Sequence, residues 1–102
     1  MNKLDAYKMD GLGNDFIIFD KRKKSISLTK DQIIKISDRN NIGCDQVIFI
    51  DADNSNNAYL TFYNSDGNEI KACGNGSRCA AYLLMKENNI KKISLKTKAG
   101  IL

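Results

Sequence analysis

The chain of 102 residues lacks histidine and tryptophan altogether and has three cysteines. These cysteines, Cys44, Cys73 and Cys79, form no CxxC pair, and without histidine the usual ligand sets of a zinc site are missing. The absence of histidine also removes the usual general base near neutral pH. Any acid–base chemistry must therefore fall to cysteine, aspartate, glutamate, lysine or tyrosine, and we expect no metal.

Long apolar stretches are missing as well. The longest runs cover residues 16–19, 47–50 and 79–85, far short of the roughly 20 residues that a membrane span requires. The first five residues lack the hydrophobic region of a secretory signal. We therefore expect a cytoplasmic protein without a membrane partner.

The charge distribution is modest. The net charge is +4, and the basic residues gather in 21–24 and 91–98 without interleaved aromatic side chains. Proteins that bind nucleic acids by stacking favour a basic face that carries aromatic rings, so we expect no nucleic-acid partner. A hydrophobic content of 42% with 27% charged residues is typical of a soluble globular chain, and no linker or repeat divides residues 1–102 into more than one domain.

Hydrophobic patterning predicts an α+β fold. The expected strands cover residues 4–9, 15–20, 25–28, 47–50, 59–64, 69–72 and 90–97. A capping box from Thr29 to Gln32 begins a helix that we expect to end near Asn40. A second helix, expected over 77–86, has little polar surface and should be buried. We therefore expect a curved, barrel-like sheet of mixed or antiparallel strands wrapped around this central helix.

The end of the sequence has the pattern of an unfinished element. Residues 99–102 are a turn followed by two apolar residues, which is typical of a strand that has only begun. We expect a domain that is truncated at its C-terminus and that exposes a sheet edge, which favours self-association.

The functional prediction depends on residues 62–81, FYNSDGNEIKACGNGSRCAA. A hairpin turn at Asp66-Gly67 returns the chain to Cys73, directly before the second helix. Backbone N–H groups at a helix N-terminus lack partners within the helix, so they bind anions and lower the pKa of a neighbouring thiol. We expect Cys73 to be an acid–base thiol; the alternative is a small buried hydrophobe.

Glycines flank Asn75 at this position. Gly74 and Gly76 let the backbone approach a ligand closely, which leaves the N–H groups of Gly74 and Asn75 available to a carboxylate. Cys79 lies six residues after Cys73 and faces elsewhere on the helix, so we interpret it as a core residue.

Three polar residues near turns are further candidates. Asn14 follows Gly-Leu-Gly, Gln46 follows Gly-Cys-Asp, and Asn64 ends an expected strand. Each type of residue is more often a turn or capping residue than a ligand contact. Amides nevertheless suit a zwitterionic amino acid, because they offer donors and acceptors without net charge. The position of Cys44 does not by itself distinguish a functional thiol from a packing residue, and we favour a packing role.

Four motifs in order resemble the N-terminal half of diaminopimelate epimerase. They are GLGNDF (11–16), IGCDQ (42–46), FYNSDGNE (62–69) and ACGNGSRC (72–79), and a TKAG turn (97–100) resembles the family's turn. The resemblance implies a cofactor-independent isomerase with a duplicated, two-domain fold, in which each half is a curved sheet around a central helix. It also implies interconversion of LL- and meso-diaminopimelate, which feeds lysine and peptidoglycan synthesis.

The same resemblance assigns roles to individual residues. The family uses two cysteines on opposite faces of the α-carbon, one as thiolate base and one as thiol acid, and Cys73 resembles one of this pair. The residues that resemble substrate contacts are the side-chain amides of Asn14, Gln46 and Asn64 and the backbone donors of Gly74 and Asn75.

The sequence departs from the family pattern at three points. Asp10 replaces an expected histidine, Cys44 replaces a small residue and adds a thiol near the expected site, and the second catalytic cysteine with its half is absent. We therefore expect the isolated chain to be inactive and to need the missing C-terminal half. The alternatives are a non-catalytic remnant that binds an amino acid or self-associates, and a related isomerase such as proline racemase or a phenazine-pathway enzyme.

Overall fold

The computed structural model describes residues 6–11, 13–22, 27–40, 42–71, 74–89 and 92–101. The predictions that concern Cys73, and those that concern the first residues of the chain, lie outside the described residues. The elements are β1 (Ala6–Gly11), β2 (Asn14–Asp20), α1 (Lys30–Ser37), β3 (Gln46–Asp51), β4 (Ala58–Asn64), β5 (Glu69–Ile70), α2 (Gly74–Asn88), β6 (Leu95–Thr97) and β7 (Gly100–Ile101).

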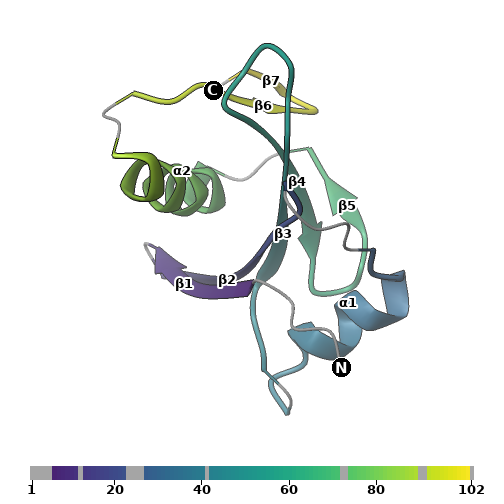
Figure 1. The fold of residues 1–102 in the computed structure, drawn as a ribbon. Coiled ribbons are helices and arrows are strands. Elements are labelled where there is room, and N and C mark those ends of the chain that lie inside the picture. The colour runs from purple at the N-terminus through teal and green to yellow at the C-terminus, as the bar shows by residue number, and fades with distance from the viewer. Residues whose placement is uncertain are drawn as a thin grey trace.

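All of these strands belong to one mixed sheet. Its order is β1-β2-β3-β4-β6-β7, and β5 also pairs with β4. The pairs β2–β3 and β4–β6 are parallel, and the other pairs are antiparallel. The sheet curves around α2, with β1 and β2 on one side of the helix and β6 and β7 on the other, while α1 lies on the outer face (Figure 1). The predicted fold class is confirmed, although over the described residues the sheet does not close into a barrel.

The inner face of the sheet packs on α2. Alternate residues of β2, β3 and β4 point toward the helix and form a buried core with it, as expected for the period of two in a strand. The strand and helix residues of this core include Phe16, Ile18, Ile48, Ile50, Leu60, Phe62, Cys79, Ala80 and Leu84. Cys79 is 6% exposed, which confirms its predicted place in the core.

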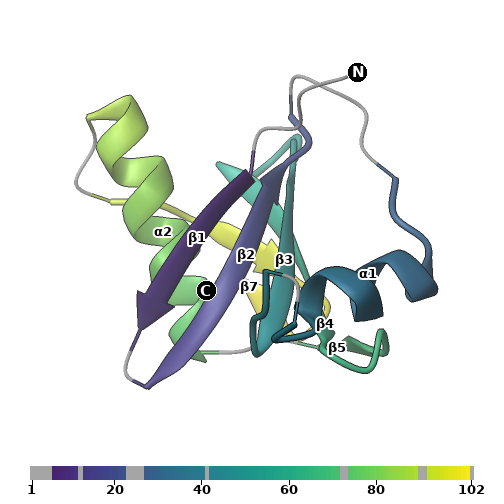
Figure 2. The ribbon, with the colours of Figure 1, turned by 90° about the horizontal axis from the view of Figure 1, so that it is seen from below.

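The outer face carries a second, more aromatic core beneath α1. It contains Ile17, Phe19, Ile33, Cys44, Val47 and Phe49. The Phe19 and Phe49 rings stack with centroids 5.5 Å apart. Helix α1 begins as predicted, because the Thr29 hydroxyl accepts from the Gln32 N–H and the Gln32 side chain accepts from the Thr29 N–H. Figure 2 shows α1 and α2 on opposite sides of the strands.

Both helices differ from the sequence prediction at their ends. Helix α1 ends at Ser37 rather than near Asn40, because Asp38 takes an extended conformation and its N–H closes the last turn. Helix α2 begins at Gly74, three residues before the predicted start, since the weak helix propensity of glycine is offset by packing. Within α2, Arg78, Tyr82 and Lys86 are exposed, so the helix is not apolar all round.

Several strands are shorter than predicted. Strand β4 gives one edge to β3 and shares the other edge, pairing with β6 at its start and with β5 at its end. Of the described residues in the two expected strands 69–72 and 90–97, Lys71 and residues 92–94 are not in a strand. Of the strand expected at 25–28, the first two residues lie outside the described residues and the last two are not in a strand. Within the part of the chain that the structure describes, neither helix is long and apolar enough to cross a membrane.

Candidate functional site

The three predicted amide residues lie together at one end of the sheet. The strand register aligns Phe16, Gln46 and Asn64 across β2, β3 and β4. The Gln46 side chain donates from Nε2 to Asn64 Oδ1 at 3.2 Å. Asn14 precedes Phe16 by two residues on β2 and so lies on the same face. We call Asn14, Gln46 and Asn64 the amide row.

The amide row lies on the inner face of the sheet, at the end where α2 begins. Gln46 and Asn64 are each two residues from a core residue that faces α2, namely Ile48 and Phe62. A Cβ added at Gly76 would lie 2.8 Å from Ile48 Cδ1 and 3.4 Å from Phe62 Cε1. The absence of a side chain at Gly76 therefore lets the first turn of α2 lie close to the sheet, beside the amide row.

The start of α2 is open on its outer side. Gly74 is exposed, and a Cβ added there would meet no atom of the described residues within 4 Å, apart from its chain neighbours and its own helix. Asn75 is half-buried. Because Gly74 and Asn75 are the first two residues of α2, their N–H groups have no partner within the helix. This arrangement can bind a carboxylate.

Two buried oxygens near this end have no hydrogen-bond partner among the described residues. They are Gln46 Oε1 and Ser77 Oγ. Ser77 lies in the first turn of α2 and is 7% exposed. Leaving a buried polar group unpaired costs about 1–3 kcal/mol, so such groups mark places where a ligand or water supplies the partner. The sequence analysis did not single out Ser77. The signal that could have identified it is a hydroxyl among small apolar residues, Cys79 and Ala80, in a helix that was expected to be buried.

The three cysteines have different positions. Cys73 directly precedes Gly74 in the sequence and lies outside the described residues, so its role stays a prediction. Cys79 is part of the inner core. Cys44 belongs to the outer core, is 2% exposed and has its Sγ 3.6 Å from Ser37 Oγ. Burial raises the pKa of the Cys44 thiol, and its favoured packing role is confirmed.

Charged residues that the sequence analysis did not single out lie just outside the amide row. Arg39 donates to both carboxylate oxygens of Asp15, at 2.5 and 2.8 Å, and to Asp45 Oδ1 at 3.1 Å. Lys8 Nζ lies 3.3 Å from Asp15 Oδ2. The Arg39 hydrogen bonds hold the pKa of the Asp15 carboxyl well below its usual range. We call Lys8, Asp15, Arg39 and Asp45 the ionic network.

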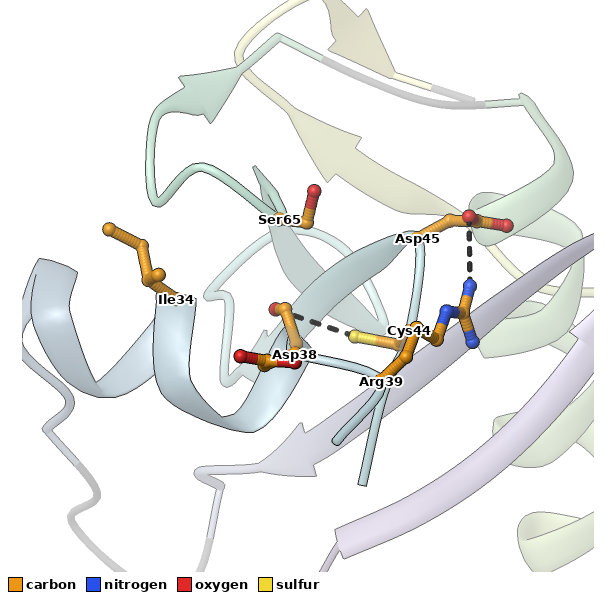
Figure 3. A pocket seen from close by; sticks show the side chains of 7 residues that line it. Ile34, Asp38, Arg39, Cys44, Asp45 and Ser65 are labelled. Atoms are coloured by element: carbon orange, nitrogen blue, oxygen red, sulfur yellow. Dashed lines mark hydrogen bonds and ion pairs between the residues drawn. The ribbon is translucent and has the colours of Figure 1, made fainter. Parts of the chain in front are cut away.

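A pocket of about 360 Å³ opens on the outer face (Figure 3). Its lining residues are Ile34, Ser37, Asp38, Arg39, Cys44, Asp45 and Ser65. Figure 3 shows the Arg39 guanidinium directed at Asp45 along one wall. None of the predicted site residues that the structure describes lines this pocket. The sheet lies between the pocket and the inner face, so the pocket is distinct from the site formed by the amide row and α2.

The chain matches the family model described as diaminopimelate epimerase over residues 6–102. The diaminopimelate epimerase of Pelagibacter ubique is 54% identical over 99 residues, which cover 97% of this chain and 36% of the relative. The enzyme of Phenylobacterium zucineum is 43% identical over 94 residues, which cover 91% of this chain and 34% of the relative. The chain thus spans about a third of the length of the curated relatives it matches.

Solved structures of a second group of proteins have a similar fold. A phenazine biosynthesis PhzC/PhzF protein from Clostridium difficile has a TM-score of 0.73 and 25% identity, covering 98% of this chain and 39% of that one. A phenazine biosynthesis protein of the PhzF family from Enterococcus faecalis has a TM-score of 0.71 and 18% identity, covering 97% of this chain and 38% of that one. At this identity the Enterococcus structure is evidence of fold alone.

Proposed function

Because the chain belongs to the diaminopimelate epimerase family, we propose that it supplies one half of a cofactor-independent active site that interconverts LL- and meso-diaminopimelate. The observation that carries the proposal is the meeting of the amide row with the N-terminus of α2 at one end of the inner face. The same proposal gives the protein a role in lysine synthesis, in the cytoplasm, with a small amino acid as its ligand.

The start of α2 suits the carboxylate of the reacting centre. Removing an α-proton from an amino acid leaves a carbanion whose charge spreads onto the adjacent carboxylate. Backbone donors from Gly74 and Asn75, aimed at that carboxylate, stabilise this charge as it develops. No pyridoxal ring is required for this stabilisation, although the donors must be already in place when the proton leaves.

In our proposal Cys73 moves the proton. A thiol has an ordinary pKa of about 8.5, close enough to neutral for it to act as base or acid. As thiolate, Cys73 takes the α-proton, while a thiol on the opposite face of the α-carbon gives its proton to that carbon and becomes thiolate. In the reverse direction Cys73 is the acid. The configuration at the carbon inverts, and one proton is gained for each proton lost.

The amide row would hold the rest of the ligand. Gln46 donates to Asn64 and leaves Oε1 as a buried acceptor, which suits the ammonium group of an amino acid. Asn14, at the start of the neighbouring strand, adds a donor and an acceptor. Amides carry no net charge, so they bind a zwitterion without creating a buried unpaired ion.

We propose that the isolated chain does not epimerise its ligand, because it spans about a third of the relatives and holds no second thiol on the inner face among its described residues other than the core residue Cys79. The partner in this proposal is the missing half of the protein. The phenazine-pathway alternative has similarity of fold behind it, whereas 54% identity to the Pelagibacter ubique enzyme favours diaminopimelate.

The test measures exchange of the α-proton in deuterated water. The purified chain should show no exchange with LL-diaminopimelate, whereas a chimera of this chain with the unmatched part of the Pelagibacter ubique relative should exchange and epimerise. Cys73→Ala in the chimera should lower exchange by at least about 10²-fold, the scale of a lost acid–base group. Cys44→Ala, a matched removal of a buried thiol, should leave the rate close to that of the parent chimera.

Three results would contradict parts of the proposal. Exchange by the isolated chain that disappears in Cys73→Ala would refute its inactivity. Undiminished exchange in the Cys73→Ala chimera would refute the role of that thiol. A folded chimera that binds diaminopimelate without any exchange would favour the amino-acid-binding remnant instead.

A further inference from the structure

Hydrogen bonds between Asp15 and Asp45 join β2 to β3 beside the amide row. The parallel ladder pairs Phe16 with Gln46. Directly outside it, the Asp15 N–H donates to Asp45 Oδ2 at 3.0 Å, and the Asp45 N–H donates to Asp15 Oδ1 at 2.9 Å and to the Asp15 carbonyl at 3.0 Å. Asp15 follows Asn14 and Asp45 precedes Gln46, so these bonds fix the backbone that carries both amides.

Arg39 holds the two aspartates together. Its guanidinium binds Asp15 through both carboxylate oxygens and reaches Asp45 with the same Nη2 atom. A bidentate Arg–carboxylate pair fixes direction as well as distance, which a lysine cannot do. Lys8 approaches Asp15 from β1 and also donates to the carbonyl of Gly43, so the network joins three segments of the chain.

The loop before β3 is shaped around the stem of Arg39. Gly43 has a φ of +81°, and a Cβ added there would lie 2.8 Å from Arg39 Cδ and 3.1 Å from Arg39 Cα. A side chain at this position would push Arg39 away from the aspartates. The conformation and the close contact together explain why glycine stands at position 43.

Arg39 belongs to the outer side of the sheet. Neighbouring residues of a strand point to opposite faces, so Asp15 points away from the face that Asn14 shares with α2. Arg39 also lines the outer pocket rather than the inner site. It can therefore act on a ligand in the inner site only through the backbone.

We propose that Arg39 is a positioning residue, which through Asp15 and Asp45 holds Asn14 and Gln46 in the geometry that receives the ligand. The proposal rests on the proposed function for the ligand, and on the hydrogen bonds above for the positioning itself. A positive charge alone, such as that of a lysine, is not enough for this role, because only the guanidinium makes the bidentate contact with Asp15.

The chain offers a matched control at the other end of the same strand. Arg22 binds Asp20 through Nε at 2.9 Å and Nη2 at 2.6 Å, and it reaches Glu87 of α2. Both arginines thus anchor an aspartate of β2 in an ion pair. Arg22 lies at the end remote from the amide row, so Arg22→Gln removes a comparable interaction without touching the proposed linkage.

The experiment follows side-chain and backbone amides of the purified chain by ¹⁵N nuclear magnetic resonance. In Arg39→Gln, the side-chain signals of Asn14 and Gln46 should shift and broaden, and hydrogen exchange at the Asp45 N–H should rise by about tenfold, as for the loss of one charged hydrogen bond. Arg22→Gln should leave these signals unchanged, and Arg39→Lys should restore them in part.

A titration with meso-diaminopimelate adds the functional readout. Arg39→Gln should raise the dissociation constant by about tenfold, while Arg22→Gln should leave it unchanged. If the unsubstituted chain binds no diaminopimelate, the ligand contacts proposed for this half are refuted, and the amide signals still test the positioning role. If Arg39→Gln leaves the amide signals and the exchange rate as they are, the positioning role is overturned.

A milder variant guards against loss of folding. Asp45→Asn keeps an oxygen that can accept from the Asp15 N–H while it weakens the contact with Arg39. It should produce the same pattern of shifts in Asn14 and Gln46 at smaller amplitude. A shift pattern spread evenly over the sheet, or one that Arg22→Gln reproduces, would show a merely structural role and would overturn the proposal.

Discussion

The inner and outer faces of the sheet differ in the pairing of their polar groups at the end where β2 and β3 begin. On the outer face the polar groups of this edge pair with one another, as Arg39 does with Asp15 and Asp45. On the inner face Gln46 Oε1 and Ser77 Oγ have no partner among the described residues. An unpaired buried oxygen is costly, whereas a paired one is not. The comparison therefore supports the proposal that the inner face binds a ligand and that the outer face holds the backbone in place.

The largest expected effect comes from the inner core. Phe62→Ala removes a fully buried ring beneath α2 and should lower the free energy of unfolding by about 3–5 kcal/mol. Urea denaturation measures the change. Tyr82→Ala, on the exposed side of α2 at 58% exposure, is the control and should change stability by less than about 0.5 kcal/mol. Equal losses in the two variants would mean that α2 does not pack on the sheet as described.

The next largest effect is expected at Gly43, in the loop that packs against Arg39 on the outer face. Gly43→Ala should lower the free energy of unfolding by about 2–3 kcal/mol, because it adds a close contact with Arg39 to the cost of a positive φ. Gly13→Ala shares the positive φ, at +91°, yet its Cβ would meet no atom within 4 Å in the described part of the chain. It should therefore cost only about 1 kcal/mol. Similar losses by thermal or urea unfolding would remove the steric role of Gly43.

A pH titration tests the charges of the outer face. The pKa of Asp15 is lowered in the folded chain, chiefly by Arg39, whereas the pKa of an aspartate in an unfolded chain is about 3.9. The stabilisation by Asp15 is therefore fully present above that value and is lost as the pH falls toward the lower folded pKa. Asp15→Asn should cost roughly 1–2 kcal/mol at pH 7, and this difference should shrink below pH 4. A difference that does not change between pH 7 and pH 3 would contradict the assignment.

The smallest expected change in stability comes from removing the hydroxyl of one buried serine on each face, Ser37 and Ser77. Ser37 Oγ donates to the Ile33 carbonyl at 2.7 Å, so Ser37→Ala should cost about 1 kcal/mol. Ser77 Oγ has no partner within the described part of the chain, so Ser77→Ala should be neutral or slightly stabilising in the free chain. Urea denaturation of both variants gives the answer. A loss of 1 kcal/mol or more in Ser77→Ala would mean that this hydroxyl is already paired.

Local signals made part of the fold predictable from sequence. The Thr29 capping box and the Asp66-Gly67 turn depend on residues within four positions of one another, and both are present as expected. The start of α2 was misplaced because glycine has a weak intrinsic helix propensity, and the contacts of Gly76 with Ile48 and Phe62 come from strands distant in sequence. Tertiary packing, rather than intrinsic helix propensity, therefore determines where α2 begins.

The candidate site was predictable as separate residues but not as an arrangement. Asn14, Gln46 and Asn64 each follow or end a recognisable element, whereas their alignment depends on the register of β2, β3 and β4. The ionic network escaped prediction for the same reason, since Arg39 and Asp15 are 24 residues apart. Contacts at such separation have no local periodicity by which a sequence could reveal them.

The parallel pairing of β2 with β3 also has a consequence for the order of folding. The hairpins β1–β2 and β3–β4 each close a short loop, while the β2–β3 pair must wait for the crossover through α1. Because distant pairings pay more loop-closure entropy before contacts compensate it, we expect the two hairpins to form early and to join late. Asn14 arrives with one hairpin and Gln46 with the other, so the amide row is complete only after the two hairpins have joined.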